Sequence, residues 1–128
     1  MTTDKTGAPT AVADLPAARR CEITVSEPGT TADGAGTLAG FAEYRDRDRD
    51  GAPTERVFFH TEVDEAFGGR GLATILVREA LDDARARGLA IVGVCPLVTA
   101  FLGKHPEYAD SSRPVTPDVL AWLRTQRD

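Results

Sequence analysis

Residues 63–75 read VDEAFGGRGLATI, in which three glycines surround one arginine just before an apolar-periodic segment. Glycine loses the most conformational freedom on ordering, so this cluster indicates either a turn with positive φ angles or a close approach to the backbone. If a helix begins here, its first N–H groups lack partners within the helix and attract anions. Gly68, Gly69 and Gly71 would let a phosphate reach them without a Cβ in the way. The stretch therefore allows two interpretations, a strained loop and a phosphate-binding turn.

The segment after the glycines predicts a helix followed by a buried strand. Its apolar positions recur in steps of three and four, which is typical of a helix with one buried face. These positions are Leu72, Ile75, Leu76, Ala80, Leu81 and Ala84. Asp83 and Arg87 form a favourable i,i+4 pair, and Gly88 stands where a left-handed residue ends a helix. Residues 89–95 are apolar throughout, which predicts a strand buried on both faces that ends at Pro96.

The remaining pattern predicts one α+β (mixed α/β) domain. Residues 1–19 are expected to be a flexible N-terminal tail, 20–110 the domain, and 111–128 a C-terminal helix packed on it. The other elements are strands at 21–25, 37–44 and 56–63, a turn at 27–36, a short helix within 97–108 that stops before Pro106, and a last helix at 117–126 capped by Thr116.

Composition excludes several classes of protein. The 128 residues are 41% hydrophobic and 27% charged, which is typical of a soluble single domain. A net charge of −5 argues against nucleic-acid binding, which needs a basic face. The two cysteines have no regular spacing, which favours free thiols in the cytoplasm over a disulfide framework. The first residues lack the basic start and apolar stretch of a signal peptide, so none is expected, and no apolar run reaches the roughly 18 residues that a membrane span needs.

Residues 46–51 read D-x-D-x-D-G, the opening of an EF-hand calcium loop. Such a loop needs a bidentate Glu at its twelfth position, which is Val57 here. Arg45, Arg47 and Arg49 alternate with the aspartates and neutralise them. We therefore predict a solvated hairpin loop between two strands rather than a metal site.

Two common phosphate-binding motifs do not fit the glycine turn. A P-loop needs a Lys after its last glycine, and none follows these glycines. A dinucleotide fingerprint that starts at Gly69 and Gly71 finds Thr74 in place of its third glycine. Three predicted strands also precede the turn, whereas that fingerprint follows the first strand of its unit.

A third pattern matches better. Gly71, Leu72 and Ala73 fit the end of [R/Q]-x-x-G-x-[G/A], the pyrophosphate motif of the GNAT superfamily of N-acetyltransferases, with Gly68 in place of the usual Arg or Gln. HTEV at 60–63, CPLV at 95–98 and KHPEY at 104–108 follow in the same order as in small single-domain members called the YjdJ type. Over roughly residues 20–110 the chain resembles this family.

The resemblance implies a GNAT-like fold: a central, mostly antiparallel sheet with a β-α-β core that binds acetyl-CoA, and a C-terminal helix. It implies an N-acetyltransferase that uses acetyl-CoA and an amine acceptor. We expect a monomer or homodimer, and from charge, apolar run length and ligand spacing we expect no nucleic-acid, membrane or metal partner. The alternative is a CoA-binding module with little turnover. The positions expected to bind CoA are Thr61, Glu62, Val63, Gly68, Gly69, Arg70, Gly71, Leu72, Ala73, Thr74, Cys95, Lys104 and His105.

Four residues are candidates for catalysis. Cys95 has three interpretations: a buried apolar residue, a nucleophile activated by His60 or His105, or a side chain that shapes the pocket. Direct transfer instead needs a base for the amine and an acid for the leaving thiolate. Glu62 and His60 are candidate bases, with side chains expected to point in opposite directions. Tyr108 is either the acid or a tyrosine packed on the core.

Overall fold

The computed structural model describes residues 2–3, 7–26 and 37–126, and the turn expected at 27–36 lies outside them. One seven-stranded sheet runs through the domain, with its strands side by side in the order of the chain. Neighbouring strands are antiparallel as far as β5, and β6 and β7 then add in parallel. The strands are β1 (Thr2–Thr3), β2 (Pro9–Leu15), β3 (Arg20–Val25), β4 (Thr37–Arg49), β5 (Ala52–Val63), β6 (Ala90–Gly93) and β7 (Ser112–Arg113). The expected α+β class is confirmed.

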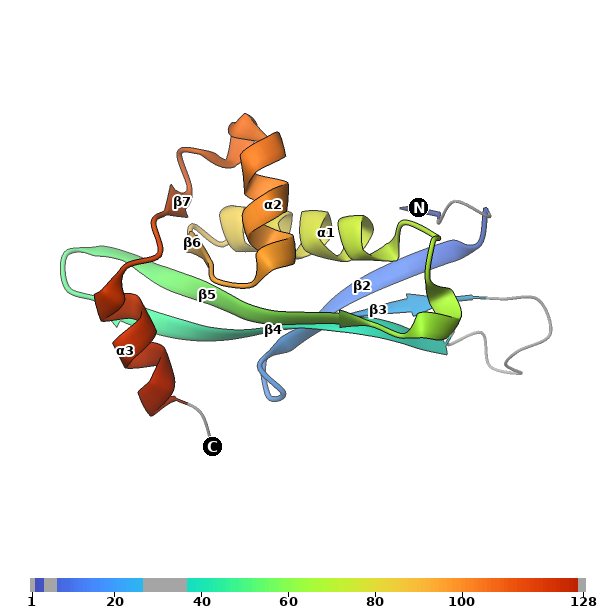
Figure 1. The fold of residues 1–128 in the computed structure, drawn as a ribbon. Coiled ribbons are helices and arrows are strands. Elements are labelled where there is room, and N and C mark those ends of the chain that lie inside the picture. Colours follow the sequence, from blue (N-terminus) through green and yellow to red (C-terminus); the bar gives the residue numbers. More distant parts are fainter. Residues whose placement is uncertain (1, 4–6, 27–36, 127–128) are drawn as a thin grey trace.

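In the part of the chain that the structure describes, three helices cover the two faces of this sheet. Helices α1 (Leu72–Ala86) and α2 (Pro96–Lys104) lie on one face, and α3 (Pro117–Thr125) lies on the other (Figure 1). Short 3-10 turns at Glu65–Phe67 and Pro106–Tyr108 precede α1 and follow α2. None of the helices in the described part of the chain is long and apolar enough to cross a membrane.

Helix α1 forms where its periodicity predicts it. Its buried residues lie on the predicted face, except that Val77 joins them and Ile75 is only partly buried. Gly88 has a φ of 75°, its N–H donates to Arg85, and the N–H of Leu89 donates to the carbonyl of Ala84. This pair of bonds is a Schellman motif, which satisfies the last carbonyls of the helix. The chain then enters β6, whose four residues are all buried.

The hydrophobic core is divided by the sheet. The larger cluster lies between the sheet and α1 with α2, and includes Phe58, Leu76 and Ile91. The smaller cluster lies under α3, where Val119 and Leu123 pack on Val57 and Val92. Adjacent residues of β5 and of β6 therefore serve opposite faces.

The aspartate-rich segment is a tight hairpin rather than a long loop. Strands β4 and β5 extend to Arg49 and from Ala52, so only Asp50 and Gly51 turn the chain, with a φ of 70° at Gly51. The strands are longer than predicted because their charged side chains pair across the hairpin. Asp46 accepts two bonds from Arg56, at 2.8 and 2.9 Å.

The expected flexible tail at 1–19 is wrong over Pro9–Leu15. These residues form β2, which pairs with β3 through six residue pairs. The strand is held because Thr10 is buried, Val12 packs against the core, and Asp14 accepts a bond of 2.5 Å from the Tyr44 hydroxyl. Apolar and polar residues alternate only weakly in this segment, so its sequence resembles a flexible tail. It forms a strand because β3 lies beside it.

A buried arginine joins four elements at one end of the sheet. The Arg56 side chain on β5 is 6% exposed and pairs with Asp46 of β4. Its Nη1 lies 3.7 Å from Asp14 of β2 and 3.7 Å from Asp83 of α1. Its guanidinium also lies 3.9 Å from the centre of the Tyr44 ring. Three carboxylates surround one cation, so the N-terminal strand and α1 are tied to the same point.

Candidate functional site

A β-bulge in β5 sets the direction of the side chains at the centre of the molecule. Tyr44 of β4 pairs with Phe58, whereas the preceding residue, Glu43, pairs with His60. Phe59 is therefore an extra residue on β5. Phe58 belongs to the core under α1, while Phe59 packs on the α3 side. Beyond the bulge Phe59 and His60 line the same pocket. A bulge of this kind re-aims side chains and is common beside functional sites.

At the same point of β5, β6 separates from it. Their pairing ends at Phe58 and Gly93, and the N–H groups of Val94 and Cys95 both donate to the Phe58 carbonyl, at 2.9 and 3.1 Å. Pro96 then begins α2, which carries the chain away from the sheet. From His60 to Val63, β5 pairs with β4 on one edge, and no strand of the described chain pairs with the other. The geometry leaves a row of peptide groups along this edge.

The glycine turn ends at an uncapped helix. Gly69 and Gly71 have φ angles of 75° and 77°, so the turn uses the left-handed conformation that glycine adopts freely. Gly71 is the N-cap of α1 and provides no side-chain bond, and the first turn carries no acidic residue. The first bond within the helix runs from the Ile75 N–H to Gly71. The N–H groups of residues 72–74 therefore have no partner within the helix.

A groove runs from this helix start along α2. We call it the α1–α2 groove; it has a volume of about 310 Å³ and combines an apolar floor with two basic side chains at one end. Its lining residues are Ala73, Thr74, Val77, Leu97, Ala100, Phe101, Lys104 and His105. His105 stacks on Phe101 with the ring centres 4.0 Å apart. Four of the expected CoA-binding residues, Ala73, Thr74, Lys104 and His105, are brought together here.

Cys95 lies at the separation of β5 from β6, on the α1 side. Its side chain is 3% exposed, and its thiol lies 3.3 Å from the Thr61 hydroxyl. The two histidines that could activate it make other contacts. His60 lies on the opposite face of the sheet, and His105 contacts Phe101 and Glu107. The thiol therefore has a neutral hydroxyl beside it rather than an imidazole.

The face of the sheet that carries α3 holds the other candidate bases. His60 Nε2 lies 3.8 Å from Glu62 Oε1, and their side chains are 49% and 62% exposed. The expectation that these side chains point in opposite directions is wrong, because residues two apart on a strand share a face. Glu43 is the cross-strand neighbour of His60. The sequence analysis missed Glu43, whose place opposite His60 depends on the bulge.

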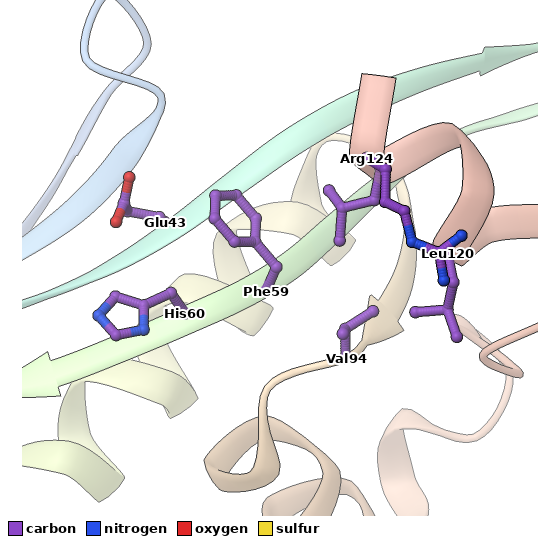
Figure 2. A pocket seen from close by; sticks show the side chains of 7 residues that line it. Glu43, Phe59, His60, Val94, Leu120 and Arg124 are labelled. Carbon is purple, nitrogen blue, oxygen red and sulfur yellow. The ribbon is translucent and has the colours of Figure 1, made fainter. Parts of the chain in front are cut away.

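Glu43 and His60 border a second cavity, the α3-side pocket, of about 440 Å³. Figure 2 shows Glu43 and His60 at one end, Leu120 and Arg124 of α3 at the other, and Phe59 and Val94 between them. Leu123 completes the lining. The one signal of this pocket in the sequence is the pair Phe58–Phe59, which breaks the alternation expected of a strand with one buried face.

Tyr108 is buried in the core under α1. Its hydroxyl donates a bond of 2.5 Å to Asp82, and burial together with this bond raises the pKa of Tyr108 to about 12. Asp82 lies in the C-terminal half of α1, so the hydroxyl is engaged away from the N-terminal end of the helix. Among the described residues, no three His, Cys, Asp or Glu side chains gather in a way that could hold a metal ion.

Comparison with known proteins gives a family. Residues 29–111 match the profile of the GCN5-related N-acetyl-transferases. No curated protein matches the chain. A solution structure of a GCN5-like protein from Staphylococcus aureus is 20% identical, with a TM-score of 0.53 over 84% of this chain and 91% of that one. This likeness shows that the two proteins share a fold.

Two further solved structures are more distant. A ribosomal-protein-alanine N-acetyltransferase from Brucella melitensis biovar Abortus 2308 is 19% identical over 76% of this chain and 65% of that one, with a TM-score of 0.46. A predicted acetyltransferase from Clostridium acetobutylicum, solved with acetyl-CoA, is 16% identical over 70% of this chain and 58% of that one, with a TM-score of 0.47.

Proposed function

Because the chain belongs to the family of GCN5-related N-acetyltransferases, we propose that it transfers the acetyl group of acetyl-CoA to the amine of a small molecule or protein. The narrower YjdJ-type grouping stays a prediction. Three features of the chain support the proposal: the uncapped start of α1, the unpaired edge of β5 and the α1–α2 groove. The first two match the pyrophosphate and the extended arm of acetyl-CoA, and the groove adds Lys104 beside the phosphate site.

The start of α1 suits the pyrophosphate. Three N–H groups at a helix N-terminus, without a side-chain cap or an acidic residue in the first turn, form an anion site. Gly69 and Gly71 keep the approach free of side chains. Arg70 belongs to the same turn, and Lys104 lines the adjoining groove, so a protein of net charge −5 offers two cations for the phosphates. Gly68, where the family pattern has Arg or Gln, adds no third.

The edge of β5 suits the extended arm that carries the thioester. Its peptide groups beyond the bulge, near Glu62 and Val63, can bond an amide-containing chain as a strand would. The arm would then end where β5 and β6 separate, beside Thr61 and Cys95, whose side chains lie 3.3 Å apart. A peptide N–H at this point would polarise the thioester carbonyl.

The chemistry requires two proton transfers. The acceptor ammonium first loses a proton to a base; the amine nitrogen then attacks the carbonyl carbon, the N–C bond forms and the C–S bond breaks. The departing thiolate takes up the second proton lost by the nitrogen. His60 and Glu62 are our candidate bases because both are accessible beside the bulge. Tyr108 is a weaker candidate acid, since its hydroxyl is engaged by Asp82.

The uncapped start of α1 is the observation that carries this proposal, and two matched variants test it. Gly71 and Gly88 have φ angles of 77° and 75° and flank the two ends of the same helix. Alanine at either position imposes the same left-handed strain of about 1–2 kcal/mol. Only Gly71→Ala adds a methyl group at the proposed phosphate site. In calorimetric titrations we expect Gly71→Ala to weaken acetyl-CoA binding at least tenfold and Gly88→Ala to leave it within about twofold.

Equal affinity in the two variants would remove the phosphate site from the proposal. The alternative function, a CoA-binding module with little turnover, predicts the same titrations. It differs in a second measurement, the release of free CoA on adding amines. Tight binding with no amine-dependent release across a broad panel would favour the binding module.

A further inference from the structure

We propose that the α3-side pocket binds the acceptor, and that this acceptor is a small molecule with an amine and an anionic group at opposite ends of an apolar body. The inference rests on the proposed function for its chemistry. It rests on the pocket itself for the identity of the ligand.

The pocket adjoins the point where β5 and β6 separate. Val94, which lines it, donates its N–H to the Phe58 carbonyl, and so does the next residue, Cys95. Val94 belongs to the α3-side cluster, whereas Cys95 belongs to the core under α1. Val94 and Cys95 therefore lie on opposite faces of the sheet, at the gap where β5 and β6 separate. A thioester held in that gap from the α1 side would be reached by an amine from the α3 side.

One end of the pocket is suited to an ammonium group. Glu43 is only partly exposed and faces His60 across the strands, and Glu62 Oε1 lies 3.8 Å from His60 Nε2. Arg20, the cross-strand neighbour of Glu43 on β3, is bonded to Glu22 instead. No basic side chain among the described residues forms an ion pair with Glu43. A bound amine would provide that missing charge and lie beside a proton acceptor.

The other end is suited to an anion. Arg124 is exposed in the last turn of α3, and no carboxylate of the described chain pairs with it. This differs from Arg47, which also reaches α3 but is bonded to Asp118. An arginine fork binds a planar carboxylate through two parallel bonds.

The middle of the pocket is apolar and held in place. Phe59, Val94 and Leu120 lie between the charged ends (Figure 2). The guanidinium of Arg45 covers the Phe59 ring at 5.0 Å, which fixes this wall. Because an apolar stretch separates the acid end from the arginine end, an ordinary α-amino acid, with both charges on one carbon, cannot reach both. A ring or chain that separates the two groups fits.

Three probes with related structures test this inference. 4-(Aminomethyl)benzoate carries the two charges at opposite ends of a ring, 4-methylbenzylamine lacks the carboxylate, and phenylalanine carries both charges on one carbon. We expect the first to bind about five- to tenfold more tightly than either of the others, the effect of one charge-assisted pair. Saturation-transfer NMR in the presence of CoA measures this binding without requiring turnover, and the KM for amine-dependent CoA release measures it again.

Variants then assign the two ends. Arg124→Gln should reduce binding of 4-(aminomethyl)benzoate to the level of 4-methylbenzylamine and leave the latter unchanged, and Arg124→Lys should keep part of the preference. Glu43→Gln should weaken both amines. Asp50→Asn, which removes one negative charge at the tip of the β4–β5 hairpin, is the control and should change neither.

The outcomes separate this inference from the proposed function. Equal binding of the three probes, or a preference that survives Arg124→Gln, overturns the acceptor assignment even if acetyl-CoA binds and turns over. Loss of acetyl-CoA binding in Gly71→Ala with an intact probe preference supports both. Probe binding without any affinity for acetyl-CoA would overturn the proposed function and leave the pocket as a ligand site.

Discussion

Cys95 is the residue whose interpretation changes most between sequence and structure. Three roles are open in the sequence. In the fold its thiol lies against the Thr61 hydroxyl, and both histidines lie elsewhere. A nucleophilic cysteine needs a base or a cation to favour the thiolate. We therefore favour Cys95 as a residue that shapes the end of the thioester site.

This preference gives a direct prediction. Cys95→Ala should retain amine-dependent CoA release within about threefold, because the attacking group is the acceptor amine and the cysteine forms no bond to the acetyl group. Intact-protein mass spectrometry after incubation with acetyl-CoA alone should show no acetyl adduct. An adduct that persists in Cys21→Ala and disappears in Cys95→Ala, with turnover lost, would restore the nucleophile.

At this scale the sequence predicts the residues that bond through the backbone better than those that act through side chains. The glycine turn was predictable because positive φ angles have a strong sequence signal. Glu43 was not, because its partner His60 is set by one extra residue in β5, and such a bulge shifts every later pair by one position. The two consecutive phenylalanines, Phe58 and Phe59, are the only sign of this bulge in the sequence.

Among the elements, α3 links stability to the proposed acceptor site. Thr116 caps this nine-residue helix by accepting a bond of 3.2 Å from the Val119 N–H. A helix of this length depends on its cap and on packing, since it is too short to be stable alone. It carries Leu120 and Arg124 into the pocket.

We expect Thr116→Ala to lower the free energy of unfolding by about 1 kcal/mol, the usual effect of losing an N-cap. Urea denaturation followed by circular dichroism measures it. Thr125→Ala is the control, because its hydroxyl bonds the Trp122 carbonyl at the other end of α3 and caps no free N–H group. A Thr116→Ala midpoint equal to that of Thr125→Ala would show that packing alone holds the helix.

The elements divide into those with strong local patterns and those that depend on neighbours. Helix α1 and strand β6 have such patterns, and their bounds were predicted within about two residues. Strands β2 and β7 were missed. Each is weakly apolar and becomes a strand only because an existing edge, β3 or β6, offers its peptide groups.

For the whole molecule, one buried thiol and two buried phenols make the free energy of unfolding decrease at alkaline pH. Burial raises the pKa of Cys21 to about 12 and that of Tyr108 to about 12, and burial with the bond to Asp14 raises the pKa of Tyr44. In the unfolded chain these groups ionise from about pH 9 to 10. Between that range and pH 12 the unfolded state loses protons that the folded state keeps, so stability falls as pH rises.

Urea denaturation at pH 8 and pH 11 should show this loss, and Tyr108→Phe should lose less between the two because it removes one of the three groups. Recovery on return to pH 8 separates titration from chemical damage. An identical pH dependence in Tyr108→Phe and the unaltered chain would contradict the assignment of this residue. At pH 8 the variant should be only slightly less stable, since its partner Asp82 is exposed.

The contacts of Arg56 show that the folded domain extends N-terminal to the residues that match the family. Similarity to the family starts at residue 29, yet Arg56 and Tyr44 inside the matched range are both bound to Asp14 outside it. A fragment that begins at residue 29 would leave Arg56 and Tyr44 without Asp14, which both of them contact. It would also expose the edge of β4 that pairs with β3. The family match therefore begins inside one packed unit, and we expect the β2–β3 hairpin to unfold together with the rest of the domain.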